Sequence, residues 1–492
     1  MTHLVASLVE GSASGVSDSS KLAFLAGADT IEVRLDHIKG LNAKQIRDAR
    51  HAVQGPTIAT LRSRAEGGRS GLPKAARHEL LITVAEAGFE YIDLETARDE
   101  EVFESIREED WRPHVIASRH FFKPVARKVI EDAFDEAFEM GDVAKVAMTC
   151  DNAEDALMLA RIGQDLARRK KRFAVIGMGA QGQLTRVFAR QIGSEFAYAC
   201  MPGLEAAPGQ LDVARQAAML ADSAVVLGLV GHPVSHSVSK PMQEAALNKA
   251  GLEGIYLPLD FPEGSFDKPA LKAMKGLGFK GLNVTIPHKA KACEMSSRLR
   301  ENARATEAVN TLIFRGGLIE GENTDVAGFS RMLDGKITIH RGMKVLMVGA
   351  GGAARAVAYV LTERGARISV LDKEKPRARA LAKLFRARAT TWAKLRQERA
   401  DFDLIVNCSP VGMKSVPGNP IKPWVFGSHK TYIDVIFNPP VTEAMHEAGK
   451  RATRSFSGLE MLVQQGAESF RIWTGVEPDV AAMRDAAQGA LR

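Results

Sequence analysis

Residues 344–372 read KVLMVGAGGAARAVAYVLTERGARISVLD. An apolar run ends at a glycine-rich segment and a second β-branched run follows, so the stretch predicts a strand, a turn, a helix and another strand. The residues of the pattern G-x-G-x-x-A and its neighbours are Gly349, Gly351, Gly352, Ala353 and Ala354. Glycines let backbone amides approach a pyrophosphate at the helix N-terminus, and Asp372 at the end of the second strand can hold a ribose hydroxyl. We therefore predict a Rossmann-like nucleotide-binding domain.

The sequence before this stretch also alternates between strand-like and helix-like segments. Its strand-like runs are SAVVLGLVG (223–231), GIYLPLD (254–260), KGLNVT (280–285) and AVNTLIF (308–314). We expect an α/β domain over 223–335, completed by 455–492, beside a nucleotide-binding domain over 336–454.

Residues 1–222 contain eight short apolar runs with helix-like sequence between them. They are LVASLVE (4–10), TIEVRLD (30–36), TIATLRS (57–63), YIDLE (91–95), HVIASRH (114–120), VAKVAMT (143–149), RFAVIGM (172–178) and FAYACM (196–201). Strands alternating with helices imply a parallel sheet, and eight βα units close a barrel. The predicted fold is α/β, an N-terminal (β/α)8 barrel followed by a two-domain dehydrogenase-like part.

Reactive side chains lie on these predicted barrel strands. Glu32, Arg34 and Asp36 share one face of the second run. Arg62, Glu95 and His120 lie at or near the ends of three others, and Lys145 lies within the sixth. Barrel enzymes carry their catalytic groups at the carboxyl ends of the strands. Because a buried, unpaired ammonium is costly, we expect Lys145 to have a depressed pKa or a charged partner.

Two further candidates lie in the second half. Lys289 ends NVTIPHK (283–289) and Asp325 lies in ENTDVAGF (322–329). An ammonium near a carboxylate can protonate a carbonyl oxygen while hydride reaches the carbon, as ketone reduction requires. Ser235 and Ser237 offer two hydroxyls to a polyhydroxylated substrate, whereas taken as an isolated pair they are better explained by turn chemistry.

Composition limits the remaining possibilities. At 492 residues, with 45% hydrophobic and 25% charged residues, the chain is expected to be a multidomain globular protein. With neither an apolar run of about 18 residues nor a signal peptide, we expect a cytoplasmic protein without a membrane partner. The net charge of +7 is concentrated in residues 364–400, which we interpret as a solvated helix face, so no nucleic-acid partner is expected. His232 and His236 are four apart, but Pro233 argues against a helix and hence against a metal site.

Ordered motifs resemble two families. Residues 1–220 resemble type I 3-dehydroquinate dehydratase through EVRLD (32–36), LRSRAEGG (61–68), IDLE (92–95), SRH (118–120), AKVAMT (144–149), GQLTR (182–186) and APGQ (207–210). Residues 224–492 resemble shikimate dehydrogenase through GHPVSHSVSKPM (231–242), NVTIPHK (283–289), AVNTL (308–312), NTD (323–325), GAGGAAR (349–355), NCSPVGM (407–413) and GLEMLVQQGA (458–467). The resemblance implies a bifunctional enzyme of the shikimate pathway, with 3-dehydroquinate, 3-dehydroshikimate and shikimate as its small-molecule ligands.

The resemblance also implies residue roles. In the dehydratase, Lys145 forms a Schiff base with the substrate, His120 transfers protons and Glu32 orients His120. The residues expected to bind its substrate are Arg34, Arg62, Arg186 and Gln210. In the dehydrogenase, Lys289 and Asp325 form the catalytic pair, and the residues expected to bind shikimate are Ser235, Ser237, Thr285, Asn310 and Gln465.

Some positions depart from the family patterns. Phe121 follows the barrel histidine where an aspartate is usual, Ala206 replaces a serine before APGQ, and Phe437 replaces a tyrosine. We expect these departures to alter affinity or rate before they abolish activity.

More than one cofactor and more than one biological role are compatible with the sequence. The resemblance favours NADP, and Lys373 would attract its 2′-phosphate, whereas the charge of Asp372 favours NAD. Other possible roles are quinate oxidation in catabolism and a catalytically inactive metabolite sensor. The sequence leaves the oligomeric state open, with a homodimer as one candidate.

Overall fold

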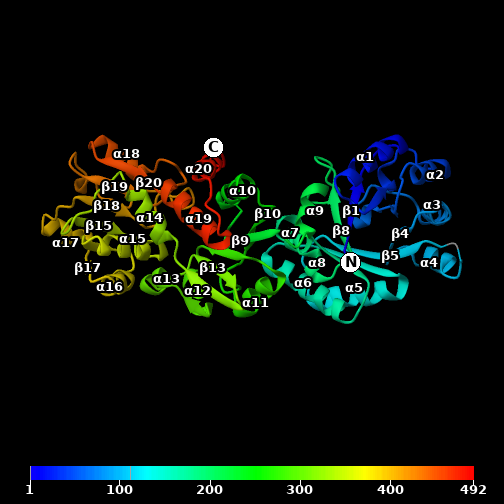
Figure 1. Cartoon of the computed structure of the whole chain (residues 1–492), viewed down its shortest axis with the longest axis horizontal. Helices are drawn as coiled ribbons and strands as arrows, with labels where there is room; N and C mark the ends of the chain where they lie inside the picture. The colour runs from blue at the N-terminus through cyan, green and yellow to red at the C-terminus, as the bar shows by residue number, and fades with distance from the viewer. Residues whose placement is uncertain (1, 111, 236, 492) are drawn as a thin grey trace. The chain divides into compact units, whose positions relative to one another are not determined.

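A computed structural model describes the whole chain except residues 1, 111, 236 and 492. The chain divides into two compact units, Met1–Val225 with Leu259–Gly278, and Val226–Pro258 with Phe279–Arg492. Both units consist of sheets covered by helices (Figure 1). The predicted α/β class is therefore confirmed.

In the described part of the chain, the first unit contains eight parallel strands in the order β7-β6-β5-β4-β3-β2-β1-β8. They are β1 (His3–Leu8), β2 (Thr30–Arg34), β3 (Thr57–Thr60), β4 (Tyr91–Glu95), β5 (His114–Phe121), β6 (Val143–Thr149), β7 (Phe173–Met178) and β8 (Phe196–Cys200). Across the seam, the backbone N–H of Glu195 donates to the carbonyl of Phe173 at 2.7 Å, which nearly closes the barrel. Each strand lies in one of the eight predicted runs or overlaps it, so the barrel prediction is confirmed.

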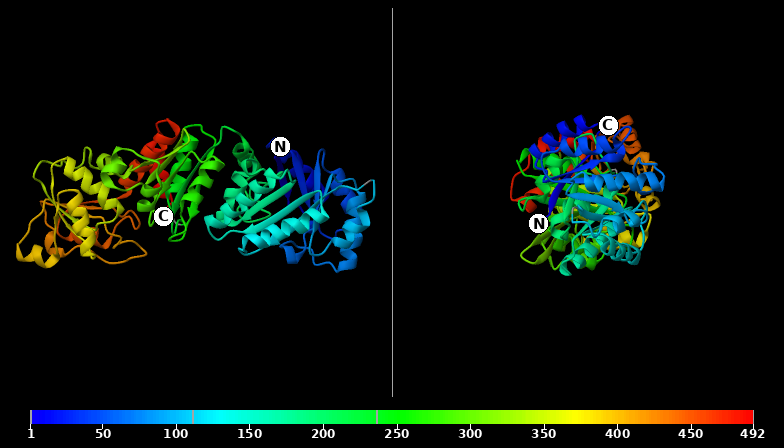
Figure 2. Two further views of the ribbon diagram at one scale, coloured as in Figure 1. Left: turned by 90° about the horizontal axis from the view of Figure 1, so that it is seen from below. Right: turned by 90° about the vertical axis from the view of Figure 1, so that its right-hand side faces the viewer.

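Helices surround these strands (Figure 2). They are α1 (Ala13–Leu25), α2 (Ala43–His51), α3 (Lys74–Glu86), α4 (Glu100–Ile106), α5 (Arg127–Met140), α6 (Ala153–Arg168), α7 (Gly179–Val187), α8 (Ala189–Ile192) and α9 (Val213–Leu220), with the 3₁₀ turns η1 (Leu35–His37) and η2 (Arg64–Glu66). Helix α11 (Lys268–Leu277) belongs to the same unit. The capping box of Asn152 and Asp155 begins α6, since each side chain accepts a backbone N–H of the other residue.

The described residues of the second unit form two six-stranded sheets. The first has the order β10-β9-β11-β13-β14-β12 and mixes parallel with antiparallel pairs. Its strands are β9 (Val225–Gly231), β10 (Gly254–Asp260), β11 (Gly281–Val284), β12 (Arg298–Leu299), β13 (Thr311–Arg315) and β14 (Leu318–Glu322). Its helices are α10 (Ser239–Lys249), α12 (Lys289–Met295), α13 (Glu301–Thr306), α14 (Asp325–Leu333), α19 (Leu459–Thr474) and α20 (Val480–Gly489).

The second sheet is entirely parallel, in the order β17-β16-β15-β18-β19-β20. Its strands are β15 (Lys344–Val348), β16 (Arg367–Leu371), β17 (Arg388–Ala389), β18 (Leu404–Asn407), β19 (Thr431–Asp434) and β20 (Arg454–Ser457). The accompanying elements are α15 (Gly352–Glu363), α16 (Lys375–Leu384), α17 (Trp392–Gln397), η3 (Pro423–Val425) and α18 (Glu443–Lys450). Counted along the chain this order is 3-2-1-4-5-6, the Rossmann order, which places a ligand at the switch point between β15 and β18.

Alternate residues of β15 supply two separate hydrophobic cores. Val345 and Met347 pack with residues of α14, α15 and α16, whereas Leu346 and Val348 pack with residues of α17 and α18. Side chains of a strand alternate between its two faces, so the run of four apolar residues in β15 is buried on both.

Candidate active sites

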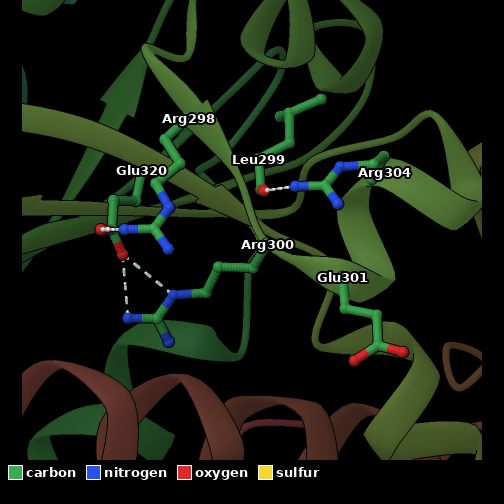
Figure 3. Close-up of a pocket in the computed structure, with 6 residues that line it drawn as sticks. All are labelled: Arg298, Leu299, Arg300, Glu301, Arg304 and Glu320. Atoms are coloured by element: carbon green, nitrogen blue, oxygen red, sulfur yellow. Dashed lines mark hydrogen bonds and ion pairs between the residues drawn. The ribbon is translucent and has the colours of Figure 1, made fainter.

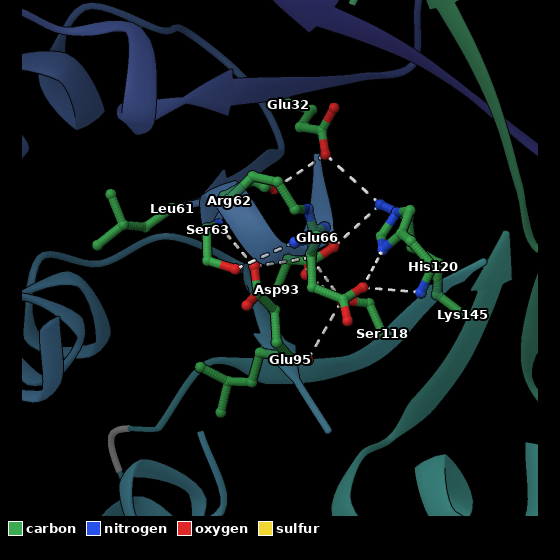
Figure 4. Close-up of polar contacts among 12 residues, drawn as sticks. Glu32, Leu61, Arg62, Ser63, Glu66, Asp93, Glu95, Ser118, His120 and Lys145 are labelled. Atoms are coloured by element: carbon green, nitrogen blue, oxygen red, sulfur yellow. Dashed lines mark hydrogen bonds and ion pairs between the residues drawn. The ribbon is translucent and has the colours of Figure 1, made fainter. Parts of the chain in front are cut away.

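Lys145 points into the barrel from β6, and its side chain is only 5% exposed. Its Nζ donates a hydrogen bond to Oδ2 of Asp93 at 2.9 Å and lies 3.6 Å from Oε1 of Glu32 (Figure 4). The same nitrogen lies 4.1 Å from the centre of the Tyr198 ring. A buried cation needs such compensation because its desolvation is costly. The expectation of a charged partner is confirmed.

Asp93 joins Lys145 to a buried arginine. Its Oδ1 lies 2.7 Å from Nη2 of Arg62, whose Nη1 donates to Oγ of Ser118 at 2.8 Å. Burial opposes ionisation of Asp93, but the charges of Arg62 and Lys145 outweigh it and hold its pKa below the ordinary value. The strand ends thus carry two cations that share one carboxylate.

His120 is bound by Glu66, which η2 carries to the end of β5. Oε2 of Glu66 accepts the backbone N–H of His120 at 2.7 Å and lies 2.9 Å from its Nδ1. Burial, followed by the nearby charges of Arg62 and Lys145, lowers the pKa of His120 well below its usual value. Burial raises the pKa of Glu66. The imidazole is therefore neutral at pH 7 and able to accept a proton.

The prediction that Glu32 orients His120 is wrong for this structure. Glu32 accepts hydrogen bonds from Oγ of Ser7 at 2.6 Å and Oγ1 of Thr60 at 2.9 Å, and its charged neighbour is Lys145. Burial opposes its ionisation, but Lys145 and Arg34 lower the pKa of Glu32. Glu32 lies on an inward-facing position of β2, which directs it to the lysine, while the histidine at the end of β5 meets the loop after β3.

The other predicted barrel residues are differently engaged. Arg34 forms two hydrogen bonds with Asp36, both at 2.9 Å. Arg186 is buried and donates to the carbonyl of Tyr198 at 3.1 Å, its Nε has no partner among the described residues, and burial lowers its pKa to about 10. Gln210 accepts the N–H groups of residues 206 and 207 at 2.8 and 3.1 Å, so its amide oxygen holds its own loop.

Sequence reasoning missed three residues of this site, namely Glu66, Asp93 and Ser118. Asp93 lies two residues before Glu95 on β4, so the two side chains point to the same face of the strand. This alternation could have predicted that Asp93 lies inside the barrel with Glu95. Glu66 had a weaker signal, since it lies in a loop whose path depends on the left-handed Gly67, with φ of +81°.

The second unit brings Lys289 and Asp325 together. Nζ of Lys289, at the start of α12, lies 2.5 Å from Oδ2 of Asp325, at the start of α14. Nδ2 of Asn310 donates to the other carboxylate oxygen at 2.9 Å and lies 3.3 Å from Oε1 of Gln465. Residues far apart in the sequence thus form one polar cluster, as the expected catalytic pair requires.

The loops that follow β9 and β11 begin side by side, because these two strands are paired in parallel. Val230 and Val284 are paired in register, and the N–H of Thr285 donates to the carbonyl of Val230 at 2.9 Å. Ser235 is exposed and Ser237 is half-buried in the loop that follows β9. His236, half of the histidine pair weighed as a metal site, lies outside the described residues.

The turn after β15 suits a dinucleotide. Gly349 has φ of +103°, and a Cβ there would lie 2.6 Å from the backbone nitrogen of Ser409, which follows β18. Gly351 caps α15, and a Cβ on it would meet nothing within 4 Å. The first residues of α15 are Gly352, Ala353 and Ala354. The turn therefore lies at the switch point and leaves open space beside a helix N-terminus, where a pyrophosphate fits.

Asp372 holds this turn. Its Oδ2 accepts the N–H of Ala350 at 2.8 Å, and its Oδ1 accepts the N–H of Glu374 at 2.8 Å. A carboxylate offers about four acceptor positions, so Asp372 can still bind a ribose hydroxyl. Lys373 is exposed beside it.

A cavity of about 410 Å³ lies elsewhere, lined by Arg298, Leu299, Arg300, Glu301, Arg304 and Glu320 (Figure 3). Arg300 bonds to Glu320 at 3.0 Å and Arg304 to the carbonyl of Leu299 at 3.0 Å. No predicted site residue lines it. Among the described residues, no helix is long and apolar enough to span a membrane, and no group of His, Cys, Asp and Glu side chains is placed to bind a metal.

The fold and these clusters define two α/β enzyme modules in one chain, a barrel with a buried lysine and a nucleotide-binding dehydrogenase. The family model of type I 3-dehydroquinase matches residues 5–224. Those of the shikimate dehydrogenase substrate binding domain, shikimate / quinate 5-dehydrogenase and the shikimate 5′-dehydrogenase C-terminal domain match 229–312, 334–417 and 458–488.

Relatives agree with the shikimate dehydrogenase matches. The shikimate dehydrogenase (NADP(+)) of Methanopyrus kandleri is 39% identical over 54% of this chain and 96% of its own length. The shikimate 5-dehydrogenase of Thermus thermophilus, solved with NADP(H) and shikimate, is 36% identical, covers 54% of this chain and 100% of its own, and has a TM-score of 0.50. A quinate dehydrogenase from Corynebacterium glutamicum, solved with NAD, is 31% identical over 54% of this chain and 99% of its own, with a TM-score of 0.51.

The chain therefore belongs to the shikimate dehydrogenase family and carries a type I 3-dehydroquinase domain before it. It is a bifunctional enzyme of the shikimate pathway. The barrel is a lyase that dehydrates 3-dehydroquinate, and the second unit is an oxidoreductase that reduces 3-dehydroshikimate to shikimate.

Proposed function

We propose that Lys145 is the Schiff-base nucleophile of the dehydratase. Its amine adds to the substrate ketone, a C=N bond replaces C=O, and the oxygen leaves as water. The protonated imine acidifies the adjacent C–H, His120 removes that proton, and the leaving hydroxyl takes a proton as the C–O bond breaks. Hydrolysis of the imine then frees the product and the lysine. The burial of Lys145 beside Asp93 and the neutral state of His120 support this sequence.

Glu66 is proposed to hold the His120 ring. If its Oε2 accepts the proton on Nδ1, 2.9 Å away, Nε2 is left as the proton acceptor. Arg34, Arg62 and Arg186 are proposed to bind the carboxylate and hydroxyls of the substrate, with Gln210 acting from its loop. The substrate-binding role is best supported for Arg186, because its Nε is buried without a partner among the described residues and can gain a hydrogen bond from a ligand.

In the dehydrogenase, Lys289 is proposed to donate a proton to the ketone oxygen while Asp325 holds the ammonium. A bound nicotinamide dinucleotide supplies the hydride. Asn310 and Gln465 are proposed to bind ring hydroxyls, and Ser235, Ser237 and Thr285 the carboxylate end of shikimate. The 2.5 Å contact between Nζ of Lys289 and Oδ2 of Asp325 carries this assignment.

We infer that NADP is the preferred cofactor. The relative from Methanopyrus kandleri is named for NADP(+), and the exposed Lys373 lies beside the predicted ribose position. The charge of Asp372 opposes a 2′-phosphate, so NAD remains the competing cofactor. A reactive lysine in each half favours a catalyst over an inactive metabolite sensor. The other alternative, quinate oxidation in catabolism, is tested by comparing kcat/KM for quinate with that for shikimate.

We further propose domains at 1–222, at 223–335 with 455–492, and at 336–454. The two separate sheets of the second unit support the last boundary. The four free cysteines suit a reducing compartment, so we propose a cytoplasmic location.

The observation that carries the dehydratase proposal is the buried pair of Lys145 and Asp93. Lys145→Ala should abolish both dehydration and borohydride trapping of substrate, while shikimate oxidation by the same chain continues. Lys128→Ala, a change at an exposed lysine of the barrel paired with Asp132, serves as the control. Trapping that persists in Lys145→Ala refutes the assignment.

A further inference from the structure

Arg77 is a buried cation outside both sets of predicted site residues. It lies in α3, is 3% exposed, and is bound by both oxygens of Asp99, at 2.8 Å from Nε and 2.7 Å from Nη2. Its Nη1 donates to the carbonyl of Leu61. This carbonyl belongs to the peptide that precedes Arg62.

A second contact from Arg77 reaches the other side of Arg62. Nη2 of Arg77 lies 3.5 Å from Oε1 of Glu95, and the same oxygen accepts the N–H of Ser63 at 2.7 Å. Asp99 also accepts the N–H of Glu95, at 2.9 Å. Both peptide groups that flank Arg62 are therefore held, one by Arg77 directly and one through Glu95.

The buried carboxylates of this cluster depend on Arg77 and Arg62 for charge compensation. The side chains of Glu95 and Asp99 are 0% and 2% exposed, and Oε2 of Glu95 has no hydrogen-bond partner among the described residues. Glu95 is compensated by Arg77 at 3.5 Å and by Nη1 of Arg62 at 3.4 Å. A buried carboxylate that loses a cation either draws the other one closer or takes up a proton. In both cases the position or the charge of the carboxylate beside the Arg62 guanidinium changes.

We propose that Arg77 is a positioning residue of the dehydratase. It fixes the backbone on both sides of Arg62 and shares Glu95 with it, so that the Arg62 guanidinium is directed to Asp93 and to the substrate. The inference rests on the proposed role of Arg62 in substrate binding. It assigns to α3, a helix outside the barrel wall, part of the affinity for the anionic substrate.

Arg77→Lys is the informative substitution, because it keeps the charge and removes the two-pronged bond to Asp99. We expect the KM for 3-dehydroquinate to rise about tenfold while kcat changes less than about threefold. Shikimate oxidation by the same chain should be unchanged. The control is Arg112→Lys, since Arg112 holds Asp142 with two contacts of 2.8 and 3.2 Å at the opposite, amino-terminal end of the strands.

A merely structural role predicts a different result. Arg77→Lys would then lower the melting temperature, as we expect for Arg112→Lys, and leave the KM of the folded fraction unchanged. That outcome overturns the proposal. If Arg77→Lys does not fold, Asp99→Asn carries the test, with the same rise in KM expected and an unchanged KM counting against it.

The route through Arg62 is tested by combining variants. If Arg77 acts through Arg62, Arg77→Lys should raise KM in the natural chain but have little further effect in an Arg62→Lys background. Equal effects in both backgrounds overturn the inference. An Arg62→Lys variant with the natural KM would instead refute the binding role of Arg62. This failure is distinguishable from a failure of the Arg77 inference, because it appears in the single Arg62→Lys variant.

Discussion

Nζ of Lys145 and Oδ2 of Asp93 lie 2.9 Å apart inside the barrel, and the other oxygen of Asp93 binds Arg62 at 2.7 Å. One carboxylate therefore contacts both the proposed nucleophile and a proposed substrate-binding cation. Asp93→Asn should lower kcat/KM for dehydration by at least about tenfold, equivalent to about 1.4 kcal/mol, because both cations lose their shared charge. Steady-state dehydration measures this, with shikimate oxidation as the internal control. Unchanged dehydration would show that Glu32 alone suffices.

The two glutamates of the barrel should have different effects. Glu66→Gln should lower kcat by about 10- to 100-fold, because His120 loses the carboxylate that orients its ring. Glu32→Gln should slow formation of the imine, because Glu32 lies 3.6 Å from Lys145 and has no hydrogen bond to His120 among the described contacts. Steady-state kcat and the single-turnover rate of borohydride-trapped adduct separate these effects. A normal kcat in Glu66→Gln would contradict its assignment.

Dehydration should remain active on the acid side of neutrality. The proposed base is the neutral imidazole of His120, and burial with neighbouring cations lowers the pKa of this residue below its ordinary value of about 6.5. His120 therefore stays unprotonated as the pH falls to 6.5, and activity should decline only at lower pH. A kcat profile between pH 5 and 9 checks this. An acid limb centred above 6.5 would be inconsistent with the environment of His120.

How far the sequence predicts these sites depends on how local each relationship is. The apolar run around Lys145 was enough to predict a buried lysine, since a parallel barrel strand such as β6 is buried on both faces. The G-x-G-x-x-A turn was predicted for the same reason, because its strand, turn and helix are consecutive. The pairing of His120 with Glu66 was not predicted, because it depends on the path of a loop between two strands. Arg77 lies on a helix whose sequence gives no sign that one buried side chain reaches the end of β3.

The ammonium of Lys289 should be required for hydride transfer only. Lys289→Ala should reduce shikimate oxidation by about 10²- to 10⁴-fold, the usual contribution of a general acid or base, and leave dehydration unchanged. Lys291→Ala is the matched control, because Lys291 is an exposed lysine of the same helix, 3.8 Å from Glu294. Coupled assays of both reactions on one preparation give the comparison. Undiminished oxidation would remove Lys289 from the mechanism.

Asp372 should determine the balance between NAD and NADP. Asp372→Asn removes a negative charge at the predicted 2′ position but keeps one oxygen for the N–H of Ala350 or Glu374. Loss of the other hydrogen bond weakens the turn for both cofactors equally, so the ratio of efficiencies is the relevant quantity. We expect the NADP to NAD ratio of kcat/KM to rise about tenfold, and less at high salt, because the removed repulsion is electrostatic. Glu374→Gln removes a neighbouring charge that already pairs with Arg377 at 3.1 Å, and it should change the ratio less. Equal shifts in both variants would mean that the general field of the basic segment, and not Asp372, selects the cofactor.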